Sequence, residues 1–214
     1  NVDGAILTGS RLPEDSIDAF GRTLPLVAIS RPIASDVIDT VNNDDHLGAM
    51  MVVDHLVSLG HRHVCHLDGG GVAGAGLRRR GYEDAMRRHG LEPHVISSQF
   101  TEAAGYEAAE RALRGDRPIT AIFAGNDMSA LGALDAIDAI GLRVPTDISL
   151  VGYDNTFVGA LRHISLTTID QRPVELATLA IDALIERVRG GRTAAKHLVT
   201  PPELIVRHTT APPP

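Results

Sequence analysis

Residues 120–155, TAIFAGNDMSALGALDAIDAIGLRVPTDISLVGYDN, decide the fold of this chain. Two short apolar runs, at residues 120–124 and 148–152, are typical of strands buried on both faces of a sheet. Between them, apolar side chains recur at the spacing of an α-helix, and Gly141 and Pro145 are suited to end that helix. The stretch therefore predicts two parallel strands joined by a helix.

Each predicted strand ends in an amide and a carboxylate: Asn126 with Asp127, and Asp154 with Asn155. In open α/β sheets, ligands bind at the carboxyl ends of the strands. Amide and carboxylate side chains there can exchange hydrogen bonds with a polyhydroxylated ligand. The alternative is structural, because Asn126 and Asp127 also suit a helix cap and Asp154 suits an Asx turn.

Strand and helix patterns alternate along the rest of the chain, which predicts an α/β fold of parallel sheets flanked by helices on both faces. Further strands are predicted at residues 5–8, 26–30, 40–42, 63–68, 94–97, 166–169, 198–200 and 203–206, and further helices at about 14–20, 48–59, 77–89, 102–113 and 173–189.

Composition restricts the class of protein. The 214 residues are 43% hydrophobic without a long apolar run, so we expect a soluble globular protein with no membrane partner. A net charge of -7 argues against direct binding of a phosphate backbone. The single cysteine, Cys65, fits a reducing compartment, and we find no signal peptide, so we expect a cytoplasmic protein.

The same stretch, IFAGNDMSALGAL followed by GLRVPTDISLVGYDN, resembles the effector-binding domain of the LacI/GalR (lac-repressor) family of bacterial transcription regulators. Five further segments follow in the order of that family: VDGAIL at residues 2–7, HLVSLGHRHV at 55–64, RRGYEDAM at 79–86, LTTIDQ at 166–171 and ELIVR at 203–207. The resemblance therefore covers nearly the whole chain.

The resemblance implies two periplasmic-binding-protein-like (type I) lobes joined by three chain crossings. We expect the N-terminal lobe to hold residues 1–61 and 168–194, and the C-terminal lobe to hold residues 62–165 and 195–208. The segment VDGAIL resembles the strand that follows the family's DNA-binding head and first two βα units. On that basis we expect the head to be absent from this chain and the first lobe to be incomplete.

The resemblance also implies ligand-binding residues in the C-terminal lobe. Arg78 stands where the family has an arginine that holds ligand hydroxyls or a carboxylate, and a guanidinium offers a planar fork of donors for this. Phe100 stands where the family often has an aromatic ring against a sugar. The alternatives are a surface arginine and a core phenylalanine. Asn126 and Asp154 complete this set.

Two further ligand-binding residues are implied outside that set. Arg31 matches a family position that faces the cleft, although a salt bridge within its own lobe is an alternative. Gln171 matches a family glutamine that faces the pocket from a crossing strand.

Other motifs carry weaker hypotheses. Gly69-x-Gly71-x-x-Gly74 has the spacing of a dinucleotide fingerprint, but no carboxylate follows the next strand, which argues against a nicotinamide dehydrogenase. His61, His63, Cys65 and His66 suggest a zinc site, but alternate residues of a strand point to opposite faces. No serine lies in a nucleophile elbow. We therefore predict no catalytic residues, no metal and no cofactor.

Together these observations predict an effector-sensing domain that binds a sugar or sugar derivative between the lobes. We expect it to be a homodimer that meets operator DNA only through a head domain outside this chain. The alternative is a periplasmic sugar-binding protein of a transport system with the same fold.

Overall fold

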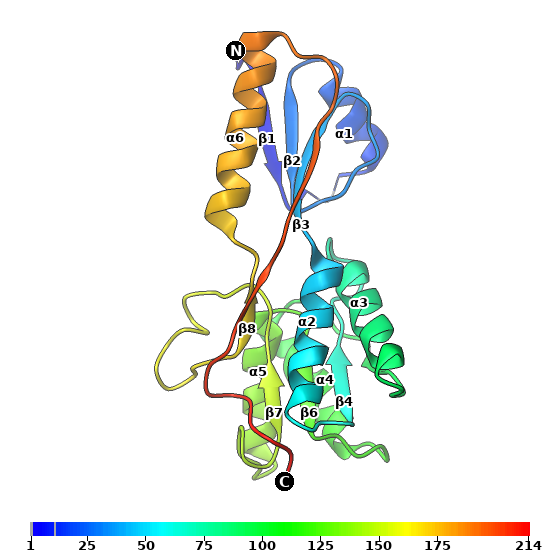
Figure 1. Cartoon of the computed structure of the whole chain (residues 1–214), viewed down its shortest axis with the longest axis vertical. Coiled ribbons are helices and arrows are strands. Elements are labelled where there is room, and N and C mark those ends of the chain that lie inside the picture. The colour runs from blue at the N-terminus through cyan, green and yellow to red at the C-terminus, as the bar shows by residue number, and fades with distance from the viewer. Residues whose placement is uncertain (1, 11) are drawn as a thin grey trace. The chain divides into compact units, whose positions relative to one another are not determined.

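A computed structural model describes residues 2–10 and 12–214, which divide into two compact units (Figure 1). Unit 1 consists of the residues up to Asp44 together with Arg172–Pro201, and unit 2 consists of Asp45–Gln171 and Pro202–Pro214. Each unit has its own parallel sheet and its own hydrophobic clusters. This arrangement confirms the predicted α/β class.

The sheet of unit 1 has the strand order β1-β2-β3-β9, and all of its pairs are parallel. Its elements are β1 (Ala5–Thr8), α1 (Glu14–Gly21), β2 (Leu26–Ile29), β3 (Asp39–Asn43), α6 (Pro173–Gly190) and β9 (His197–Thr200). Side chains of β2 alternate between the two faces. Leu26 packs with Ile17 of α1, whereas Val27 packs with Leu176 of α6, so the two helices cover opposite faces.

A buried carboxylate ties β3 to the segment that follows α6. Asp39 is 0% exposed, and it accepts hydrogen bonds from Arg187 at 2.9 Å and from the main-chain N–H of Lys196 at 2.8 Å. Arg192 pairs with the same carboxylate. Burial disfavours the charged form of Asp39, but the two arginines outweigh it and lower the pKa to about 2.

The main sheet of unit 2 has the order β5-β4-β6-β7, again all parallel. Its elements are α2 (Asp45–Ser58), β4 (Val64–Leu67), α3 (Ala75–Arg88), β5 (His94–Ile96), α4 (Glu102–Arg114), β6 (Ala121–Ala124), α5 (Asp127–Ala139) and β7 (Ser149–Val151). A separate antiparallel pair joins β8 (Thr168–Asp170) to β10 (Glu203–Ile205). Helices α2 and α3 pack on one face of the main sheet, and α4 and α5 pack on the other.

Glycines allow α4 and α5 to approach closely. A Cβ atom at Gly105 would lie 2.2 Å from the carbonyl oxygen of Ser129, and one at Gly132 would lie 2.0 Å from that of Glu102. Real Cβ atoms essentially never come this close, so each helix presents bare backbone to the other. This packing fixes the N-terminus of α5, where Asn126 lies.

The structure divides the chain at other places than the predicted lobe boundaries. The predicted N-terminal lobe includes residues 45–61, but α2 packs against α3 in unit 2, where Val52 and Leu56 contact Tyr82 and Met86. The predicted C-terminal lobe includes residues 195–200, but β9 pairs with β3 in unit 1 and Leu198 joins its hydrophobic cluster. Packing and strand pairing, which the crossing points alone do not specify, decide that α2 belongs to unit 2 and β9 to unit 1.

None of the helices in the described part of the chain combines the length and the apolar character needed to span a membrane.

Candidate functional site

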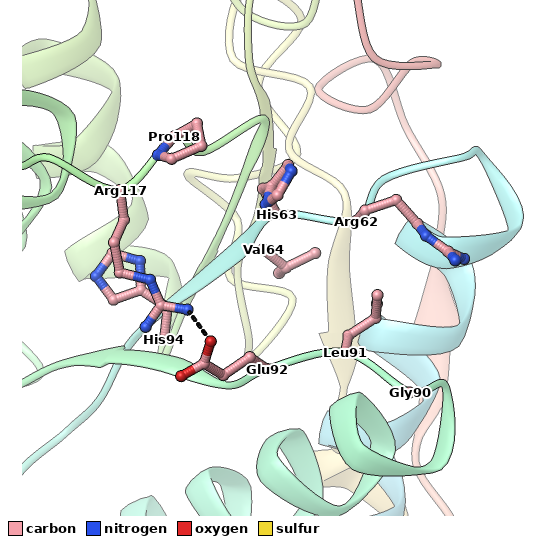
Figure 2. A pocket seen from close by; sticks show the side chains of 9 residues that line it. All are labelled: Arg62, His63, Val64, Gly90, Leu91, Glu92, His94, Arg117 and Pro118. Atoms are coloured by element: carbon pink, nitrogen blue, oxygen red, sulfur yellow. Dashed lines mark ion pairs between the residues drawn. The ribbon is translucent and has the colours of Figure 1, made fainter.

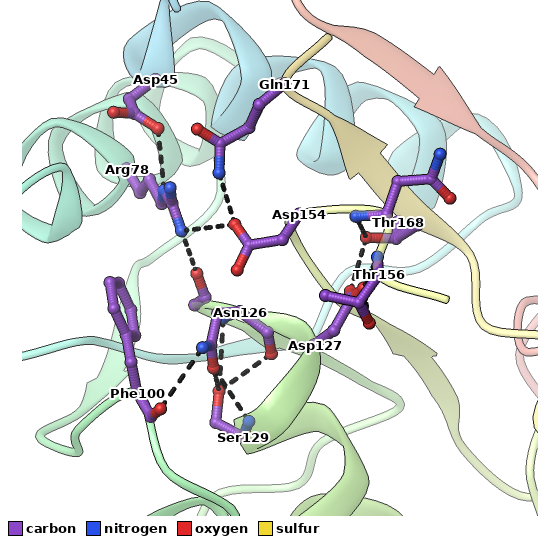
Figure 3. Close-up of polar contacts among 12 residues, drawn as sticks. Asp45, Arg78, Phe100, Asn126, Asp127, Ser129, Asp154, Thr156, Thr168 and Gln171 are labelled. Atoms are coloured by element: carbon purple, nitrogen blue, oxygen red, sulfur yellow. Dashed lines mark hydrogen bonds and ion pairs between the residues drawn. The ribbon is translucent and has the colours of Figure 1, made fainter. Parts of the chain in front are cut away.

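Strands β6 and β7 of unit 2 are neighbours, so their carboxyl ends bring Asn126 and Asp154 to the same edge of the sheet (Figure 3). Asn126 is the N-cap of α5: its side-chain oxygen accepts a hydrogen bond from the N–H of Ser129 at 2.9 Å. Its amide nitrogen donates to the carbonyl of Phe100 at 3.4 Å. Asn126 therefore has the capping role that sequence analysis held as the alternative, and its role toward a ligand stays a prediction.

Arg78 is the buried cation of this edge, with only 5% of its surface exposed. Its Nε donates to Asp45 at 2.8 Å, and its Nη1 donates to the carbonyl of Gly125 at 2.7 Å and reaches Asp154 at 3.5 Å. The guanidinium carbon lies 3.8 Å from the ring centroid of Tyr153. Burial opposes the charged guanidinium, but Asp45 and Asp154 outweigh it and raise the pKa of Arg78. Arg78 is thus not a surface arginine.

Asp154 lies opposite Arg78 in an unusual backbone conformation, with φ of 115°. A residue other than glycine is strained at such a positive φ, and it keeps this conformation only where the surrounding structure holds it. Its main-chain N–H donates to Ile169 at 2.8 Å, and its Oδ1 accepts a hydrogen bond from the side-chain amide of Gln171. Burial raises the pKa of Asp154 to about 6, against the opposing charge of Arg78.

Two polar atoms of this edge are left unused. Within the described residues, no hydrogen bond is made by Nη2 of Arg78 or by the second carboxylate oxygen of Asp154. One is a donor and the other an acceptor. A hydroxyl-bearing molecule can satisfy both, because a hydroxyl group accepts and donates at once.

Phe100 occupies space that two glycines leave open. A Cβ atom at Gly69 would lie 2.1 Å from the Phe100 ring, and one at Gly125 would lie 2.8 Å from it. The ring also faces the Arg78 guanidinium, whose carbon is 5.2 Å from the ring centroid. The ring is only partly buried, so it forms an apolar surface beside the polar groups.

A second carboxylate holds the loop that carries Asp154. Asp127 is 0% exposed and accepts hydrogen bonds from the main-chain N–H of Thr156 at 2.7 Å and from the hydroxyl of Thr168 at 2.6 Å. Burial raises the pKa of Asp127, although both threonines oppose this change. Asp127 therefore ties the loop after β7 to β8 and is itself fully used.

The structure brings together five of the six candidates that sequence analysis named, and it adds two neighbours that sequence analysis missed. Arg78, Phe100, Asn126, Asp154 and Gln171 all lie at this edge of unit 2. The missed residues are Asp45 and Tyr153, which both contact Arg78 although they lie far from it in the sequence. A buried arginine needs a carboxylate partner, and that was the available signal for Asp45.

Arg31 belongs to unit 1, whereas the other candidates belong to unit 2. Its Nη1 donates to the carbonyls of Ser10 and Leu12, each at 2.6 Å. This is a contact within its own unit, made to backbone oxygens instead of the carboxylate of a salt bridge. A contact from Arg31 to a ligand stays a prediction.

The two weaker motifs have structural explanations in unit 2. His61 is 1% exposed, and its ring nitrogens bond to Thr120, Ser149 and the carbonyl of Ala211. In the described residues there is no group of three or more His, Cys, Asp or Glu side chains that could hold a metal ion. In the glycine-rich loop, the carboxylate of Asp68 accepts a hydrogen bond from the N–H of Gly70 at 3.0 Å. This N–H is therefore not free to bind a phosphate, as it would be in a dinucleotide fingerprint.

Comparison with known families and relatives agrees with the fold. A family model described as the periplasmic binding protein-like domain matches residues 53–210. The HTH-type transcriptional regulator DegA of Bacillus subtilis is 34% identical over 219 residues, and the match covers 99% of this chain and 65% of DegA. The chain thus spans just under two thirds of the length of this curated relative.

Solved structures extend the comparison to three dimensions. A LacI transcriptional regulator from a Rhodococcus species is 37% identical with a TM-score of 0.95, covering 98% of this chain and 78% of that one. A LacI family transcriptional regulator from Enterococcus faecium with bound ribose is 26% identical with a TM-score of 0.89, covering 99% of this chain and 80% of that one.

Proposed function

We propose that this chain, which belongs to the LacI family of transcriptional regulators and carries its periplasmic binding protein-like domain, senses a small sugar or sugar derivative. The proteins to which it is similar are transcriptional regulators, which favours this function over sugar transport and over an enzyme activity. The ligand controls binding to operator DNA by the whole protein, which acts in the cytoplasm as a homodimer.

One observation carries the proposal: Arg78 and Asp154 present an unused donor and an unused acceptor at the carboxyl edge of the unit 2 sheet. Arg78 is held by Asp45 and Gly125, so its remaining donors are already oriented before a ligand arrives. Such preorganisation lowers the entropic cost of binding. The partly exposed ring of Phe100 adds an apolar surface against which the C–H face of a sugar can pack.

The bound ribose of the Enterococcus faecium regulator supports a hydroxylated ligand class for this chain. In the proposed mechanism the ligand favours one arrangement of the domain over another, and it can do so only through different affinities for the two. Enclosure of the ligand between the lobes, with Arg31 contributing from the first lobe, stays a prediction.

Calorimetric titration tests this proposal. Pentoses, hexoses and disaccharides are titrated into the wild-type chain and into Asp154→Ala. We expect one sugar to bind the wild type and to bind Asp154→Ala about 10-fold to 100-fold more weakly, because a hydrogen bond to a charged group is worth about 1.5–3 kcal/mol.

The matched control is Asp147→Ala, which removes a partly exposed carboxylate of unit 2 that pairs with Arg143. We expect sugar affinity to be unchanged in this variant. Equal binding by the wild type and Asp154→Ala would contradict the proposed site, and the failure of every sugar to bind would contradict the proposed ligand class.

A further inference from the structure

A hollow lined by several charged side chains lies at the other end of the unit 2 sheet. It has a volume of about 330 Å³ and is lined where β4, β5 and β6 begin (Figure 2). Small-molecule sites typically start at about 300 Å³. Because β4 has four residues at about 3.3 Å each, roughly 13 Å of strand separates this hollow from the carboxyl edge that carries Asp154. It is therefore distinct from the site described above.

The topology of the sheet concentrates cationic and imidazole side chains around the hollow. Arg62 and His63 precede β4, His94 begins β5, and Arg117 precedes β6. These three strands are adjacent in the order β5-β4-β6, and neighbouring strands lie about 4.8 Å apart. Figure 2 shows the side chains of Arg117 and His94 close together on one side of the hollow, whereas the Arg62 guanidinium points away from them.

Most of these groups have no partner among the described residues. Among the residues that the structure describes, the side chains of Arg62, His63 and His94 make no hydrogen bond or ion pair. Arg117 donates to the carbonyl of Pro93 at 3.3 Å. These donors remain available for an anion, since arginine offers every N–H as a donor and a neutral imidazole still offers one. Burial, together with the charge of Arg117, lowers the pKa of His94, so its ring serves as a neutral donor.

A single carboxylate, that of Glu92, opposes them. It meets Arg117 at 3.5 Å, and its side chain is 85% exposed. An exposed ion pair of this length contributes little, so a bound anion can take the place of Glu92 beside Arg117. Leu91 and the buried Val64 give the hollow an apolar wall as well.

We propose that this hollow binds a small ligand bearing an oxyanion, a phosphate or a carboxylate, through Arg117, with His94 and His63 as further donors. The planar fork of arginine matches the oxygens of either group. The body of the ligand lies against Val64 and Leu91. The site is independent of the proposed sugar site and does not require it.

Nuclear magnetic resonance of the histidine side chains tests this site on the 214-residue chain. Inorganic phosphate and, separately, acetate are added at constant ionic strength. We expect saturable shifts of His63 and His94, while His163 and His208, which do not line the hollow, stay unchanged. Saturation by phosphate alone identifies phosphate-bearing ligands, and saturation by acetate as well extends the class to carboxylates.

Two matched arginine variants decide whether the shifts report the hollow. Arg117→Gln should weaken the apparent dissociation constant about tenfold, because it removes a charge-assisted donor. Arg114→Gln, which removes an exposed arginine paired with Glu110, should leave it unchanged. Shifts that do not saturate with either anion, or equal weakening in both variants, would overturn the proposal. Circular dichroism confirms that both variants are folded.

Discussion

The pKa of Asp154 makes the stability of unit 2 depend on pH in a direction opposite to that of most carboxylates. Burial raises this pKa from 3.8 to about 6, so the folded protein binds the proton more tightly than the unfolded chain. The stabilising contribution of the protonated form is fully present below about pH 3.8 and is lost as pH rises through about 6. Asp154→Asn removes this titration and keeps an oxygen that can accept from Gln171.

The magnitude follows from the two pKa values. Each pKa unit is worth about 1.36 kcal/mol, so the difference between about 6 and 3.8 corresponds to about 3 kcal/mol. About half of this falls between pH 5 and pH 7.5, because the unfolded carboxyl is already ionised at pH 5. The wild type should therefore lose roughly 1.5 kcal/mol relative to Asp154→Asn over that range.

Urea unfolding followed by tyrosine fluorescence measures this difference. The chain has no tryptophan, and its three tyrosines, Tyr82, Tyr106 and Tyr153, all lie in unit 2, so the signal reports that unit alone. Subtracting the free energies of unfolding of the wild type and Asp154→Asn at each pH cancels the contribution of every other titrating group. A difference that stays constant from pH 5 to pH 7.5 would refute the raised pKa.

The partly exposed carboxylate of Asp147 provides the control. A hydrogen bond from Arg143 lowers the pKa of Asp147, so its contribution is present above about 3.8 and is lost only as pH falls. Asp147→Asn should therefore parallel the wild type between pH 5 and pH 7.5.

Three further perturbations test other parts of the structure. Asp39→Asn should destabilise unit 1 by about 3 kcal/mol, because it leaves the buried Arg187 without its charge partner, and faster amide hydrogen exchange in β2 and β3 would show this. Burial lowers the pKa of His66 to about 4, so the folding stability of unit 2 falls as pH drops from 6.5 through 4. His66→Phe should remove up to about 3 kcal/mol of this loss. An unchanged midpoint of acid unfolding, followed by circular dichroism, would contradict this expectation. Gly105→Ala should cost about 2 kcal/mol or more in urea unfolding, whereas Gly76→Ala, whose Cβ would meet only the Arg80 side chain at 3.5 Å, should change stability by less than about 1 kcal/mol.

Local signals in the sequence predict most of the secondary structure. Thr101 caps α4 through its hydroxyl, Pro173 begins α6, and Gly141 has the left-handed φ of 80° expected after α5. Each is a short-range effect: a side chain satisfies a nearby N–H, or a backbone adopts a φ that only its own residue type favours. Such effects can be read without knowledge of the rest of the chain.

The candidate site is predicted only in part for the same reason. Asp154 and Asn126 follow strands, so their edge of the sheet can be inferred from the chain order. Whether an oxygen of Asn126 serves a cap or a ligand depends on Ser129, and whether Arg78 is exposed depends on how α2 and α3 pack. The partner of Arg78, Asp45, lies 33 positions earlier, and no local pattern connects the two.

The sequence by itself determined the alternation of strands and helices, the ends of the helices and the polar tips of two neighbouring strands, because propensity, capping and periodicity act over a few residues. Only the tertiary structure decided which sheet receives α2 and β9, which side chains surround Arg78 and Asp154, and how far their pKa values move. Those outcomes depend on burial and on contacts between distant segments, and both exist only once the chain has packed.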